Sequence, residues 1–125
     1  MRTACMVMLV VVSVGFAGSF TWTGNGSDDD WDTTANWTSS SCMGCYPDDT
    51  GDDATIPTPA CCTGYAVNLI TESIDDLTIE GDVDFSGASG DPVLTVDSVT
   101  IIGPAVLTMS DASIRTLTSW GCEYE

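Results

Sequence analysis

Short runs of β-forming residues recur from Tyr65 onward, and they constrain the fold more than any other feature of the sequence. The runs are separated by Gly, Pro, Asp and Ser, and they comprise residues 66–70, 77–79, 83–85, 93–96, 99–102, 106–109 and 114–117. Most of them alternate apolar residues with Thr or Asp, which is the pattern of a half-buried strand. Residues 18–60 show no helical period, so the sequence predicts an all-β chain.

One of these runs is repeated along the chain. Leu77-Thr78-Ile79 is followed by Gly81, and Val99-Thr100-Ile101 is followed by Gly103 at an offset of 22 residues. A period in this range is typical of stacked-repeat folds, in which each repeat buries its inward side chains only against its neighbours. We therefore expect a short right-handed parallel β-helix, or β-solenoid, with a β-sandwich as the alternative.

The first 17 residues have the composition of a secretory signal peptide. Arg2 precedes an apolar run that extends from Ala4 to Phe16, and Gly15 and Ala17 are small residues at the two positions that a signal peptidase reads. The run is shorter than the roughly 20 residues that a membrane-spanning helix needs, although an uncleaved anchor is the alternative. We expect cleavage after Ala17, a secreted or cell-surface location, and no membrane segment in the mature chain.

Composition changes again near residue 64. Residues 18–64 are rich in Trp, Asp and Cys, whereas residues 65–125 carry the β-forming runs. The predicted organisation is therefore a signal peptide at 1–17, an N-terminal cap at 18–64 and solenoid coils at 65–125.

Charge excludes several classes of function. The chain has 19 Asp and Glu residues against two Lys and Arg, and with no His its net charge at pH 7 is −17. Nucleic-acid binding needs Lys and Arg to neutralise phosphates, so we expect none. The absence of His removes the usual Ser–His, Cys–His and His–metal sites. Asp75, Asp76, Asp82 and Asp84 are carboxylates of the kind that glycoside hydrolases use, but Asp75 and Asp76 are adjacent and expected in a turn. We predict no catalytic residues and no enzyme activity.

Two clusters of aspartates are candidate calcium sites. They comprise Asp28, Asp29, Asp30 and Asp32 in the first cluster, and Asp48, Asp49, Asp52 and Asp53 in the second. Calcium takes about six to eight oxygen ligands in a flexible geometry. Neither cluster has the spacing of an EF-hand or of the glycine-rich nonapeptide repeat of calcium-binding β-rolls, and solvated acidic loops are the alternative. The second cluster is favoured because Gly51 allows the backbone to turn inward.

Five cysteines follow the predicted signal peptide. They are Cys42, Cys45, Cys61, Cys62 and Cys122. An exported chain meets an oxidising compartment, so disulfides are expected. A bridge between the adjacent Cys61 and Cys62 would strain the peptide, and we expect Cys42 and Cys45 each to pair with one of them. A four-thiolate zinc site is the alternative. Cys122 is then free or pairs between chains.

Three tryptophans, Trp22, Trp31 and Trp37, lie among the aspartates of the first cluster. Two interpretations are open. The indoles can cover the apolar interior at the end of a stacked fold, with the aspartates in a solvent loop. Alternatively, they can form an exposed aromatic surface that stacks on sugar rings.

The order of these residues resembles the N-terminal region of secreted bacterial β-helix surface proteins of the planctomycete and autotransporter-like kind. The shared pattern comprises Trp22-Thr23-Gly24, Trp31, Ala35-Asn36-Trp37, Pro47 and Gly51-Asp52-Asp53-Ala54-Thr55-Ile56, before the repeated coils. The resemblance implies a non-catalytic structural or adhesive role at the cell surface, with the tryptophans as a cap. Its expected partners are surface glycans, other surface proteins, or a second copy joined through the open end or Cys122. A carbohydrate-binding module that uses the tryptophans is the alternative function.

Overall fold

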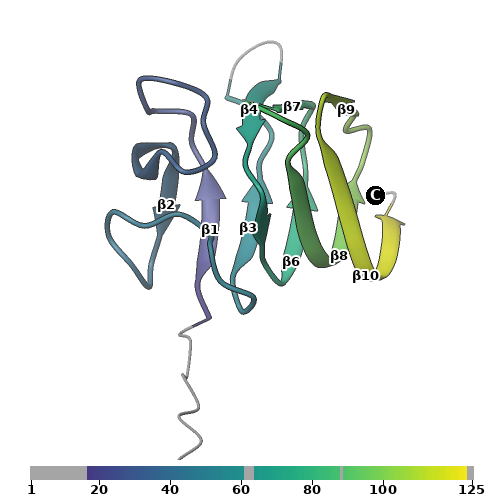
Figure 1. Cartoon of the computed structure of the whole chain (residues 1–125), viewed down its shortest axis with the longest axis horizontal. Helices are drawn as coiled ribbons and strands as arrows, with labels where there is room; N and C mark the ends of the chain where they lie inside the picture. The colour runs from purple at the N-terminus through teal and green to yellow at the C-terminus, as the bar shows by residue number, and fades with distance from the viewer. Residues whose placement is uncertain (1–16, 61–63, 88, 124–125) are drawn as a thin grey trace, which may run out of the picture.

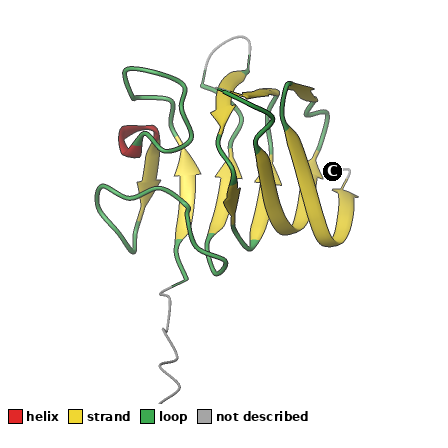
Figure 2. Ribbon diagram, in the orientation of Figure 1, coloured by secondary structure: helices red, strands yellow, loops and turns green. Residues whose placement is uncertain are grey.

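The computed structural model describes residues 17–60, 64–87 and 89–123 (Figure 1). The predicted signal peptide, except Ala17, lies outside the described residues, as do Cys61 and Cys62. One short 3-10 helix, η1 (Thr34–Asn36), accompanies the strands. The strands are β1 (Ser19–Trp22), β2 (Trp37–Ser39), β3 (Asp53–Ile56), β4 (Tyr65–Leu69), β5 (Glu72–Ser73), β6 (Asp76–Ile79), β7 (Val83–Gly87), β8 (Val93–Ile102), β9 (Leu107–Ser110) and β10 (Ser113–Glu123). The predicted all-β class is confirmed, as Figure 2 shows.

The strands form two sheets. The larger sheet has the order β10-β8-β6-β3-β1-β2, with β5 also paired to β8, and the smaller has the order β4-β7-β9. Pairing between these strands is parallel except for β1 with β2, which is antiparallel. In Figure 1 the strands β1, β3, β6, β8 and β10 stand side by side, so the chain advances along the long axis.

The prediction of a short right-handed parallel β-helix is wrong. The larger sheet mixes parallel and antiparallel strands, and the two sheets are compatible with the β-sandwich alternative. The spacing between paired residues also changes along the sheet, because Ser19 pairs with Asp53 whereas Leu77 pairs with Val99. A repeat seen in two copies determines how two strands pair, but it does not determine the direction or sheet of the other strands.

The 22-residue repeat is the register of β6 and β8. Leu77 lies opposite Val99, Thr78 opposite Thr100 and Ile79 opposite Ile101. Leu77, Ile79 and Val99 are buried, whereas the two threonines are half-buried on the other face. The alternation follows from the two-residue period of a strand, which sends successive side chains to opposite faces.

One apolar core joins the two sheets. It contains Ile56, Leu77 and Val99 from the larger sheet and Val67 and Phe85 from the smaller sheet, each fully buried. The three N-terminal tryptophans belong to the same core. The predicted cap (18–64) and the β-rich region (65–125) therefore share one core, and β3 and β6 also place them in one sheet.

The disulfide that the structure contains differs from the predicted pairing. Cys42 is bonded to Cys45, three residues along the chain, with a Cα–Cα distance of 5.8 Å. The expected bridges from these two residues to Cys61 and Cys62 are therefore wrong, and a zinc site would lack two of its four thiolates. Gly44 explains the short loop, because its φ of 73° is a left-handed conformation that glycine adopts without strain.

Candidate functional site

The three N-terminal tryptophans form a buried aromatic cluster. Trp31 and Trp22 are 0% and 1% exposed, and their rings lie 4.7 Å and 5.0 Å from the ring of Trp37 in edge-on contacts. Trp22 ends β1 and Trp37 begins β2, and the two residues are paired in the antiparallel ladder. Such edge-on aromatic pairs add about 0.5 to 1.5 kcal/mol to the effect of burial.

Hydrogen bonds fix two of the indoles. Trp31 Nε1 donates to the carbonyl oxygen of Pro47 at 3.0 Å, and Trp37 Nε1 donates to the carbonyl oxygen of Trp31 at 2.7 Å. Stacking on a sugar ring needs an exposed ring face. The structure therefore does not offer Trp22, Trp31 and Trp37 as a ligand platform, and the three indoles fill the N-terminal end of the core.

Asn36 organises the loop that carries the first aspartate cluster. Its side chain is fully buried, accepts a hydrogen bond from the Gly26 N–H at 2.7 Å, and donates to the carbonyl oxygens of Asp28 and Asp30 at 2.9 Å and 3.1 Å. The carboxylates of Asp28 and Asp30 each accept a hydrogen bond from a nearby group of the fold. Asp28 Oδ1 accepts from the Asp30 N–H, and Asp30 Oδ1 accepts from Asn68 Nδ2. Within the described ranges, this predicted calcium cluster does not converge on a common point.

The second predicted calcium cluster is divided between two faces. Asp52 is buried and accepts backbone N–H groups from Gly18 at 2.9 Å, from Asp48 at 3.2 Å and from Asp49 at 3.1 Å. Its carboxylate therefore holds the turn together, while Asp48 and Asp49 are exposed. Asp53 is the next residue, and its side chain faces away from Asp52 because successive residues of a strand alternate.

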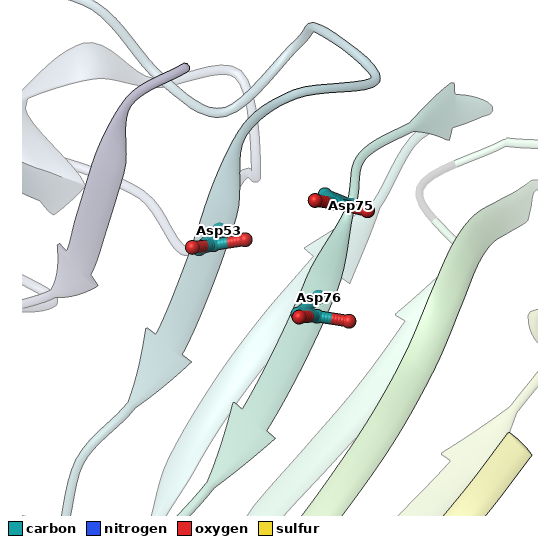
Figure 3. Close-up of side chains that lie close together, drawn as sticks. All are labelled: Asp53, Asp75 and Asp76. Atoms are coloured by element: carbon teal, nitrogen blue, oxygen red, sulfur yellow. The ribbon is translucent and has the colours of Figure 1, made fainter.

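Asp53 instead meets Asp75 and Asp76 on the outer face of the larger sheet (Figure 3). One carboxylate oxygen of each residue lies within 4.8 Å of the other two. Asp53 begins β3, Asp76 begins the neighbouring strand β6, and Asp75 directly precedes it. We call these three residues the acidic triad. Asp53 and Asp76 are exposed, and Asp75 is half-buried.

The electrostatics of the acidic triad are repulsive. Partial burial raises the pKa of Asp53 above its ordinary value of 3.8, and the negative charges of Asp76, Asp75 and Asp52 raise it further. The backbone N–H of Asp76 hydrogen-bonds the Asp53 carboxylate and acts in the opposite direction. Because the charged form is disfavoured in the folded chain, a proton or a cation at this position relieves the repulsion.

The acidic triad offers hard oxygen ligands, which suit Ca²⁺ or Mg²⁺. Three carboxylates are fewer than the roughly six to eight oxygens that calcium takes, so solvent would have to supply the remainder. Calcium stays a prediction, and Asp53 is the residue of the predicted cluster that lies in the triad. Glycoside hydrolysis needs two carboxylates on either side of a bound sugar, whereas these three lie together on an open sheet face.

Sequence reasoning placed Asp75 and Asp76 in a turn and missed their approach to Asp53. The signal that could have found it is a second repeat. Asp53-Ala54-Thr55-Ile56 and Asp76-Leu77-Thr78-Ile79 share Asp, Thr and Ile at equivalent positions. Ala54 pairs with Leu77 in the parallel ladder, so equivalent side chains lie side by side.

A row of threonines crosses the outer face beside the acidic triad. Thr21 pairs with Thr55, Thr55 with Thr78, and Thr78 with Thr100, and all four are half-buried. We call these four residues the threonine strip. Neighbouring strands are about 4.8 Å apart, so the hydroxyl groups recur at that interval across four strands. Ser98, which pairs with Asp76, donates its hydroxyl hydrogen to Asp76 Oδ1.

Comparisons of the chain with protein-family models, with curated proteins and with solved structures gave no match. The resemblance to secreted bacterial β-helix surface proteins therefore stays a prediction. In the part of the chain that the structure describes, no helix has the length and apolar character to cross a membrane.

Proposed function

We propose that this chain is a secreted, non-catalytic structural or adhesive module of the cell surface or the extracellular matrix. The observation that carries the proposal is the outer face of the larger sheet, where the threonine strip runs beside the acidic triad. Adhesion through this face requires no reacting group. It requires a rigid surface whose polar groups are held in fixed positions.

The geometry of the face favours an extended partner over a small molecule. Small-molecule sites are concave and bury most of the ligand. The threonine strip instead repeats one hydroxyl group on each of four adjacent strands. A partner that repeats its own hydrogen-bonding groups, such as a surface glycan or another surface protein, can engage several of these hydroxyls together.

Charge limits the partner further. With a net charge of −17, the chain repels nucleic acids and anionic lipid surfaces at long range. Neutral glycans, basic protein surfaces, and acidic surfaces bridged by divalent cations remain compatible with the acidic triad. Trp22, Trp31 and Trp37 are packed in the core, so the proposed contacts are the hydroxyl groups of the threonine strip and the carboxylates of the acidic triad.

Location is tested by expressing the full chain in a secreting host and measuring its distribution between the cell interior, the cell surface and the medium. We expect the protein in the last two fractions. Accumulation inside the cell, in a folded form, contradicts the proposal.

Adhesion is tested with the purified secreted protein and the cells that produce it. Thr78→Arg places a bulky cation in the middle of the threonine strip, and we expect it to abolish binding measured by a cell pull-down. Thr108→Arg is the matched control, because Thr108 is exposed on β9 of the smaller sheet. Both variants are first checked for native unfolding midpoints. Equal binding by the two variants excludes this face as the adhesive surface.

A further inference from the structure

Asp52 is a buried carboxylate whose hydrogen-bond donors are neutral amides. It is 4% exposed, and its two oxygens accept the N–H groups of Gly18, Asp48 and Asp49. A buried ionised group is expensive unless a charge of the opposite sign accompanies it. The two cationic side chains of the whole sequence are Arg2, within the predicted signal peptide, and Arg115. Arg115 belongs to β10, at the opposite end of the larger sheet from β1, next to which Gly18 lies.

Gly18 is the residue that follows the predicted signal-peptide cleavage site. Ala17 is exposed, whereas Gly18 is buried, so the chain enters the fold between these two residues. The Gly18 nitrogen lies 2.9 Å from Asp52 Oδ1, and its carbonyl oxygen accepts the Asp53 N–H at 2.8 Å. A Cβ atom at position 18 would lie 2.5 Å from the Phe20 ring and 3.0 Å from Asp52 Oδ1, so glycine is needed there.

We infer that cleavage after Ala17 creates an α-ammonium group on Gly18 that docks on Asp52 as a buried ion pair, so that removal of the leader completes the fold. Hydrolysis breaks the C–N bond between the two residues and consumes one water. The hydroxyl group goes to Ala17, which leaves as a carboxylate, and the Gly18 nitrogen takes up protons to become –NH₃⁺. The inference rests on the secretion that the proposed function includes.

The surroundings of Gly18 suit an ammonium group. A cavity of about 270 Å³ borders Gly18 and Asp52, and Asp48 and Asp49 line it as well. Its volume accommodates water for the two N–H groups that do not face Asp52. The exposed carboxylates of Asp48 and Asp49 add negative charge on the same side. The neutral amide donor at 2.9 Å is thereby replaced by a charge-assisted donor at the same atom, which makes a stronger hydrogen bond.

The composition makes this inference directly measurable. Both basic residues are arginines, so the mature chain contains no lysine and its N-terminus is its one primary amine. For the test, the full chain is expressed in a secreting host, and the intact mass of the exported product identifies its first residue. The product is then treated with an amine-reactive ester at neutral pH, and single acylation is followed by mass spectrometry in buffer and in urea.

We expect a product that begins at Gly18 and that is acylated at least about tenfold more slowly when folded than when unfolded, the factor that corresponds to one pKa unit. Asp52→Asn is expected to bring the folded rate close to the unfolded rate. Asp91→Asn removes the same charge from an exposed position and is expected to leave the rate unchanged. If Asp52→Asn does not fold, the acylation rate of the folded wild-type protein is followed as the pH rises: an ion pair shifts the onset of reaction to a higher pH than in urea, whereas burial alone lowers the rate without that shift.

The possible failures are distinguishable. A chain that is not exported overturns the proposed function together with this inference. An exported product that begins at another residue, or retains its leader, overturns the docking of Gly18 and leaves the proposed location standing. A product that begins at Gly18 but is acylated equally fast in buffer and in urea also overturns the docking alone.

Discussion

The two ends of the larger sheet differ in the strand that forms the edge and in the side chains that lie beside it. At the N-terminal end, the antiparallel strand β2 follows β1, and the aromatic cluster and the buried Asn36 lie beside it. At the C-terminal end, β10 pairs with β8 alone. The apolar side chain of Leu117 in β10 is 63% exposed, and Val106, directly before the last strand of the smaller sheet, is 56% exposed. Within the described residues, both ends are edge strands, but β2 has 3 residues and is backed by buried aromatic side chains, whereas β10 has 11 residues.

We expect this difference to make one end of the sheet important for the stability of the fold and the other end important for association between copies of the chain. A longer edge strand leaves more backbone N–H and C=O groups available to another chain, and a short edge strand limits such pairing. We therefore expect mutations at the N-terminal end to change the free energy of unfolding, and mutations in β10 to change self-association. The predicted contact between copies, through this open end or through Cys122, stays a prediction and belongs to β10.

The largest effect is expected for Trp31→Ala. The residue is fully buried and its indole N–H donates to the Pro47 carbonyl, so its removal leaves a large cavity and one broken hydrogen bond, whereas the backbone carbonyl that accepts from Trp37 is kept. We expect a loss of about 3 to 5 kcal/mol in the free energy of unfolding, measured by urea denaturation. Leu117→Ala, at the other end, is expected to change it by less than about 0.5 kcal/mol. Equal losses in the free energy of unfolding for the two variants would show that the two ends do not differ in their contribution to stability.

A smaller effect is expected for Asn36→Ala. The substitution removes three hydrogen bonds and leaves the Gly26 N–H and the carbonyl groups of Asp28 and Asp30 to find other partners. Leaving a buried polar group unsatisfied costs about 1 to 3 kcal/mol. Asn25→Ala is the control, because Asn25 is exposed. A shift in urea midpoint no larger for Asn36→Ala than for Asn25→Ala would show that the loop does not depend on this amide.

The acidic triad lies between the two ends, and Asp53→Asn is expected to stabilise the protein. The folded-state pKa of Asp53 is raised above 3.8, so the charged carboxylate destabilises the fold at neutral pH, and this cost disappears as the pH falls through the raised pKa toward 3.8. Solvent screens these partly exposed groups, so the gain at pH 7 is about 0.5 kcal/mol or less.

The pH dependence distinguishes this effect from the general benefit of removing one negative charge. Thermal unfolding at pH 7 and at pH 3.5 should show the advantage of Asp53→Asn over wild type at the higher pH only. Asp91→Asn, which removes an exposed charge elsewhere, should show a smaller advantage at pH 7. An advantage that is independent of pH would mean that the carboxylate repulsion is not its source.

The smallest effect on stability is expected for Leu117→Lys. Leu117 is 63% exposed in β10, so the free energy of unfolding should change by less than about 0.5 kcal/mol. A lysine on an edge strand opposes pairing with a second copy. Sedimentation velocity over a range of concentrations should show weaker self-association than for wild type. If the wild-type protein is monomeric at every concentration, the expectation that β10 mediates self-association is wrong.

Strand positions followed closely from the sequence. The predicted runs at 77–79 and 83–85 lie within β6 and β7, and the run at 114–117 lies within β10. Alternating side chains report which face of a strand is buried, so local pattern suffices for these elements. The runs at 93–96 and 99–102 were predicted as separate strands but form the single strand β8, because Asp97 and Ser98 between them continue the parallel pairing with residues 75 and 76.

The direction of the strands, their order in the sheet and the acidic triad could not be predicted from local sequence pattern in the same way. The direction of β2 depends on the contact between Trp22 and Trp37, which brings the chain back beside β1. The acidic triad depends on which strands become neighbours, and that was not evident until β3 and β6 were aligned. Asp52 and Asp53 are adjacent in the sequence, yet one lies in the interior and the other on the outer face. Composition alone treats two such aspartates as equivalent.

The backbone bridge between Asp30 and Asn68 has a consequence for the order of events during synthesis. The loop that carries Trp31 hydrogen-bonds residue 68, because the Trp31 N–H donates to the Asn68 carbonyl and the Asn68 N–H donates to that of Asp29. Pairing between segments so distant in sequence is slow, since loop closure precedes any gain from contacts. A chain that emerges from its N-terminus therefore cannot close this end until more than half of its length is available. Until then the loop that carries Trp31 lacks the strand β4 against which it is held.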